Sequence, residues 1–119
     1  MDQDIHFQKV ITWAAAAATT DYMIVPYRCT LRNMTAICQT SIDAGETITV
    51  TYGATTTAAT AIGVMTMATG AGGIGTWVAD TTTGETVMAA NGYLKFVTSN
   101  SAGSISVCDI DIEFDPYAR

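Results

Sequence analysis

The chain is poor in basic residues and in charge of either sign. Five lysines and arginines stand against eleven aspartates and glutamates in 119 residues, for a formal net charge of -6. Neutralising nucleic-acid phosphates needs the opposite balance, so we expect no direct nucleic-acid partner. Charged residues make up only 13% of the chain, well below the roughly 25% of ordinary soluble domains. The outer surface should therefore consist of small uncharged side chains, which suit close packing against other subunits; a small domain that simply has a threonine-covered surface is the alternative.

Long apolar runs and catalytic motifs are also missing. The longest apolar stretches fall far short of about 20 residues, so we expect no membrane span. The run Ala14–Ala18 is too short for a secretory signal. His6 is the only histidine, and no GxSxG, HExxH, CxxC or phosphate-loop motif occurs. These absences favour a protein that is not an enzyme and that binds no cofactor and no metal.

The three cysteines are an odd count without a paired motif. Cys29, Cys38 and Cys108 have no metal-ligand spacing and form no disulfide framework. We expect three thiols that behave as small apolar residues in a protein made in a reducing cytoplasm. A single bridge is the alternative.

Threonine and alanine dominate what is present, with 21 and 18 residues against only two leucines. Isoleucine and valine add 19, so β-branched residues number 40, and their stiff side chains favour strands over helices. Short strand patterns separated by turn signals, with no useful amphipathic helix, predict an all-β, single-domain antiparallel sandwich. The eight-stranded jelly roll is the specific prediction.

The predicted sandwich spans residues 21–119, after an N-terminal arm and connector over residues 1–20. Residues 5–13 alternate imperfectly and fit either a strand or an extended arm, and the alanine run fits a helical turn or a connector. Strict alternation over 47–52 predicts that Ile48, Val50 and Tyr52 point inward while threonines line the outer face.

Three local signals refine this prediction. Asn33 shifts the alternation that begins at Cys29. Val107 and Ile110 have opposite parity, which implies a β-bulge near residues 108 and 109 if both face the core. Asn91 and Gly92 form a hairpin signal between strands expected at 87–90 and 93–98.

Four carboxylates occupy alternate positions near the end of the chain, at Asp109, Asp111, Glu113 and Asp115. A strand would place them on one face, about 6 to 7 Å apart. Calcium needs ligands that wrap around the ion from a curved loop. A solvated acidic stripe or docking surface is therefore favoured over a cation site, which remains the alternative.

Three parts of the chain carry a family resemblance, namely residues 43–53, the glycine- and threonine-rich loops, and the ending at 105–119. In these parts the chain resembles the head decoration, or capsid cement, proteins of bacteriophages. The resemblance implies a jelly-roll domain that forms a homotrimer, binds the major capsid protein on the outer surface of the head, and stabilises the shell. It implies assembly in the host cytoplasm, a final place on the virion, and no catalytic residues.

A decoration protein needs a docking surface, and the arm from Asp2 to Trp13 is the predicted one. An extended chain can add a strand to a neighbouring subunit through main-chain hydrogen bonds. The predicted partner-binding residues are Asp2, Asp4, Ile5, His6, Phe7 and Trp13. The alternative function is a domain of a tail-fibre or receptor-binding protein whose aromatic side chains stack on host surface glycans.

Overall fold

The structure is a computed structural model that describes residues 5–13, 18–38, 46–67, 74–79, 86–99 and 106–116. In these ranges the chain forms nine strands: β1 (Ile5–Trp13), β2 (Thr20–Ile24), β3 (Cys29–Cys38), β4 (Thr47–Gly53), β5 (Thr60–Met67), β6 (Gly75–Ala79), β7 (Val87–Met88), β8 (Tyr93–Thr98) and β9 (Ser106–Asp115). The described residues include no helix, and hence none of a length and hydropathy that could span a membrane.

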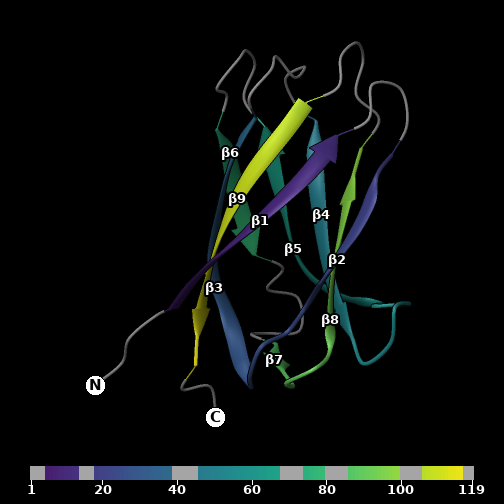
Figure 1. Cartoon of the computed structure of the whole chain (residues 1–119), viewed down its shortest axis with the longest axis vertical. Coiled ribbons are helices and arrows are strands. Elements are labelled where there is room, and N and C mark those ends of the chain that lie inside the picture. Colours follow the sequence, from purple (N-terminus) through teal and green to yellow (C-terminus); the bar gives the residue numbers. More distant parts are fainter. Residues whose placement is uncertain are drawn as a thin grey trace.

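The strands form two antiparallel sheets, with the orders β1-β9-β3-β7 and β2-β8-β4-β5-β6 (Figure 1). Pairing is nested, because β1 pairs with β9, β2 with β8, β3 with β7, and β4 with β5. Strand β6 adds to the edge beyond β5. The other eight strands have the nested order of a jelly roll. The predicted all-β antiparallel sandwich is confirmed, with one strand more than the eight of the jelly roll.

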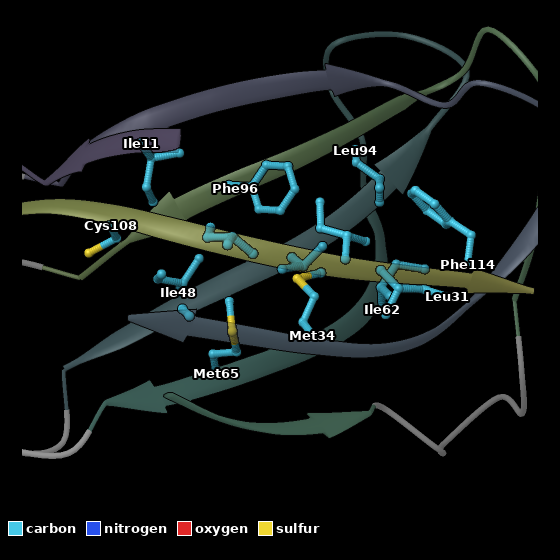
Figure 2. Close-up of a cluster of buried hydrophobic side chains, with 14 of the residues drawn as sticks. Ile11, Leu31, Met34, Ile48, Ile62, Met65, Leu94, Phe96, Cys108 and Phe114 are labelled. Carbon is cyan, nitrogen blue, oxygen red and sulfur yellow. The ribbon is translucent and has the colours of Figure 1, made fainter. Parts of the chain in front are cut away.

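The core lies between the two sheets and follows from the alternation of each strand. In β4, Ile48 and Val50 are fully buried while Tyr52 is half-buried, as the sequence predicts. In β9, every second side chain from Cys108 to Phe114 is fully buried. Figure 2 shows these side chains meeting those of the five-stranded sheet, such as Phe96 and Leu94.

Residues 5–13 form a strand of the sandwich and not a free arm. β1 pairs with β9 over its whole length, beginning with Ile5 opposite Phe114. Ile11 is only 2% exposed, so β1 contributes to the core. The sandwich therefore includes residues placed in the arm by the sequence prediction. Residues 14–17 of the alanine run lie outside the described residues.

One of the two predicted changes of phase is present. The register of β3 against β9 shifts between Leu31 and Asn33, which keeps both halves of β3 facing the core. The bulge predicted near Cys108 is wrong, since β9 pairs with β1 without interruption. Val107 lies on the outer face with Asp109. A single apolar side chain is tolerated outside a core, so no bulge is needed to turn Val107 inward.

The Asn91–Gly92 turn is present but joins two sheets, so the predicted hairpin is wrong. Strand β7 pairs with β3, whereas β8 pairs with β2 and β4. Asn91 has a φ of 68°, the left-handed conformation that favours asparagine and glycine. The Asn91 N–H donates to the carbonyl of Val25 at 2.8 Å, and the Val25 N–H donates to the carbonyl of Gly92 at 2.8 Å. The turn is thus fixed to the end of β2, where the chain crosses between the sheets.

Cys38 and Cys108 form a disulfide, so the expectation of three free thiols is wrong. The two residues lie directly opposite each other on β3 and β9, with a Cα–Cα distance of 4.2 Å and a sequence separation of 70. Cys29 keeps its thiol and is buried. Spacing in the sequence could not indicate the pair, because only the jelly-roll topology brings residues so far apart into register.

Candidate interaction surfaces

The structure describes the side chains of three of the six predicted partner-binding residues, and these three do not share one exposed face. Ile5 and His6 are exposed on β1. Phe7 points inward and packs edge to face on Phe114, with ring centroids 5.7 Å apart. Trp13 ends β1, its side chain lies outside the described part of the structure, and so do Asp2 and Asp4. Phe7 is therefore half-buried against the core, and a role for the six residues in partner binding stays a prediction.

The outer face of the four-stranded sheet carries the acidic stripe, and we call it the acidic face. Asp109, Asp111 and Glu113 lie in the middle strand β9, flanked by β1 and β3. The Nδ1 of His6 is 2.8 Å from a carboxylate oxygen of Asp111. Arg32, in the bulge of β3, donates to Asp115 at 3.0 Å. The prediction that the four carboxylates share one face is confirmed for this sheet.

The carboxylates of the acidic face are spread along a strand and do not surround a common point. Two of them have cationic or imidazole partners from neighbouring strands, as described above. Within the described ranges, no group of three His, Cys, Asp or Glu residues has the arrangement that could hold a metal ion. The geometry favours a charged docking or solvated face.

The outer face of the five-stranded sheet has a different character, and we call it the Thr/Val face. Its outward side chains come from alternate positions of all five strands. They are Thr20, Tyr22, Ile24, Thr47, Thr49, Thr51, Ala61, Val64, Thr66, Thr76, Val78, Tyr93, Lys95 and Val97. Lys95 is the only charged side chain among these described positions. In a chain with a net charge of -6, this face has no outward-pointing carboxylate on its described strands.

A hollow of about 230 Å³ opens on the Thr/Val face over β4, β5 and β6. Its lining is small and mostly apolar, and includes Thr49, Ala61, Val64, Val78 and Ala79. The register of β5 shifts between Val50 and Thr51 of β4, so that this part of the sheet is irregular.

Gly63, which also lines the hollow, has no room for a side chain. A Cβ there would lie 2.6 Å from Cζ2 of the Trp77 ring and 2.6 Å from the carbonyl oxygen of Val78. Trp77 packs on the core from the opposite side of the sheet. Glycine at position 63 therefore leaves room for the Trp77 ring on the core side of the sheet.

A buried thiol, Cys29, and a half-buried phenol, Tyr27, lie together near the end of the sandwich where β3 begins. Burial, and to a smaller extent the negative charge of Asp115, raises the pKa of the Cys29 thiol to about 11. Burial, and secondarily Cys29, raises the pKa of Tyr27. Both groups are therefore neutral near pH 7. A thiol held neutral is a poor nucleophile, so Cys29 has a structural environment and not a reactive one.

Comparisons of the chain with models of protein families, with curated proteins and with solved structures find no match.

Proposed function

We propose that the protein is a non-enzymatic virion protein, a decoration or cement protein that binds the outer surface of a phage head. Its partner is the major capsid protein, whose subunit contacts it stabilises, and it acts as a homotrimer. The proposal starts from the family resemblance of the sequence, and the structural observation that carries it is the contrast between the two outer faces of the sandwich.

A decoration protein needs one surface for the shell and another for its own copies. The acidic face and the Thr/Val face are two broad sheet surfaces that differ sharply in charge. Weakly charged surfaces lose little hydration when they are covered, whereas charged surfaces select a complementary partner. Two such surfaces on opposite sides of a small sandwich support a role as a layer between other proteins.

The disulfide supports a place on the virion. Disulfides persist in oxidising surroundings, which include virion surfaces, and are rare in proteins that stay in the cytosol. The Cys38–Cys108 bridge joins two neighbouring strands of the four-stranded sheet. A protein assembled in the host cytoplasm would gain this bridge after release, when an external oxidant such as dioxygen takes two electrons and two protons from the thiols of Cys38 and Cys108.

Binding to undecorated heads tests the proposal. Purified protein is mixed with heads that lack it, and bound copies per head are counted by quantitative gel analysis and electron microscopy. We expect saturable binding, and decorated heads that release DNA at a higher temperature than bare ones. Absence of binding would refute the proposal, and a glycan-array signal in its place would favour a tail-fibre or receptor-binding domain.

A further inference from the structure

We propose that the Thr/Val face is where copies of this chain contact one another, with Tyr22 of one copy seated in the hollow of the next. The charge of the chain decides which outer face can contact a second copy. Copies that each carry a net charge of -6 repel one another. Of the two outer sheet faces, only the Thr/Val face lets a second copy approach without bringing carboxylates of described strands together.

The projecting side chains and the hollow lie at opposite sides of the same face. Tyr22 and Ile24 lie on the outer face of the edge strand β2, with 37% and 50% of their surfaces exposed. The Tyr22 ring packs edge to face on Tyr93, with ring centroids 6.4 Å apart, and must turn away from it to enter a neighbouring hollow. The hollow lies over β4, β5 and β6, toward the other edge. Three strand spacings separate β2 from β5, or about 14 Å.

Tyr22 and the hollow share one row across the sheet. Tyr22 pairs with Lys95, Lys95 with Thr51, and Thr51 with Ala61. Consider two such faces that meet around a two-fold axis running parallel to the strands, between β8 and β4. Strand β2 of each copy then lies over β5 of the other, and each Tyr22 comes to lie over the hollow of the other copy. The contact is then self-complementary, as a symmetric interface requires.

The sizes agree. A cavity of about 150 Å³ holds benzene, so the hollow of about 230 Å³ accepts the phenol ring of Tyr22. Five strands about 4.8 Å apart and roughly 20 Å long give a face of roughly 500 Å² per copy. The two-fold arrangement lays β2 of one copy over β5 of the other and leaves β6 outside the contact, so the area buried on the two copies stays below about 1,000 Å², the size of weak and transient contacts. We therefore expect weak association that needs a high protein concentration.

Salt dependence gives the contact a signature. Packing Thr/Val faces brings the Lys95 side chains of two copies closer together and adds to the repulsion of their net charges. Salt screens both effects, since the Debye length falls from about 10 Å at 0.1 M to about 3 Å at 1 M. Association through this face should strengthen with salt, whereas contact between a charged face and an opposite charge should weaken.

Sedimentation equilibrium of the whole chain over a wide range of concentrations tests the inference. Val78, which lines the hollow and is 63% exposed, is replaced in Val78→Glu. Val10→Glu is the matched control, because Val10 is a 54% exposed strand valine on the acidic face and the net charge changes equally. We expect Val78→Glu and Tyr22→Ala each to weaken self-association at least tenfold and Val10→Glu to leave it unchanged.

Circular dichroism of each variant establishes that it is folded. A complex of two copies that Val78→Glu and Tyr22→Ala dissociate supports the inference, and it would replace the homotrimer of the proposed function by a two-fold dimer. A complex of three copies overturns it, because a two-fold contact does not close a ring of three. A monomer at all concentrations, or a complex that both variants leave intact, overturns it. The inference does not depend on capsid binding, so a chain that self-associates through this face but binds no head would refute only the proposed function.

Discussion

Removal of the bridge between Cys38 and Cys108 should lower the free energy of unfolding by about 4 kcal/mol. The bridge closes a loop with a sequence separation of 70, and the chain-entropy relation assigns about 4.4 kcal/mol at 25 °C to a loop of that length. The unfolding entropy is roughly 2.1 cal/mol/K per residue. Over 119 residues, a loss of about 4 kcal/mol corresponds to a melting temperature lower by about 16 °C.

The perturbation is the double variant Cys38→Ala with Cys108→Ala, measured by urea denaturation followed through tryptophan fluorescence. Cys29→Ala is the control, because it removes a buried sulfur but leaves the bridge intact. Peptide mapping without reductant should recover residues 38 and 108 in one linked fragment. A linked fragment together with a loss below about 1 kcal/mol would show that the entropic reasoning fails here.

Three further predictions concern the core and its edges. Gly63→Ala should destabilise the protein by about 1 to 3 kcal/mol, since the new Cβ meets the Trp77 ring; adding Trp77→Leu should restore part of that loss, and an unchanged urea midpoint in Gly63→Ala would contradict the packing. Phe114→Ala, at a fully buried position, should cost about 3 to 5 kcal/mol in the same assay, and a loss below about 1 kcal/mol would count against its central place. Folding raises the pKa of Cys29 from 9.0 to about 11, so the thiol of the unfolded chain ionises first as the pH rises. The free energy of unfolding should therefore fall between these pH values, by at most about 1.4 kcal/mol per pH unit. The free energy of unfolding of Cys29→Ala should fall less steeply over the same range, and equal slopes would contradict the assignment.

Alternation within the strands made much of the fold predictable from sequence. The threonines of 47–52 and the carboxylates at alternate positions of β9 lie on outer faces as their parity indicates. The break in β3 at Asn33 was readable because two apolar sets of opposite parity flank it and both must reach the core. Period-two patterns record which side of a sheet a residue faces, and the described strands follow them.

Pairing partners were not predictable, because they depend on contacts between distant segments. Imperfect alternation in β1 did not distinguish an arm from an edge strand, and only pairing with β9 decides it. Asn91 and Gly92 encode a tight turn with positive φ, but not which sheet the next strand joins. The same holds for the candidate surfaces. The acidic face follows from parity, whereas the hollow lies where β4, β5 and β6 are brought together by pairing.

The nested pairing of the strands also sets when the protein can fold. Strand β9 lies between β1 and β3 in its sheet, although it is the last of the described strands in the order of synthesis. Until it emerges, β1 has no partner among the described strands, and Cys38 cannot meet Cys108. Because non-local pairing is slow, the four-stranded sheet should stay open until β9 has been made, and the sandwich would become competent for assembly only after that.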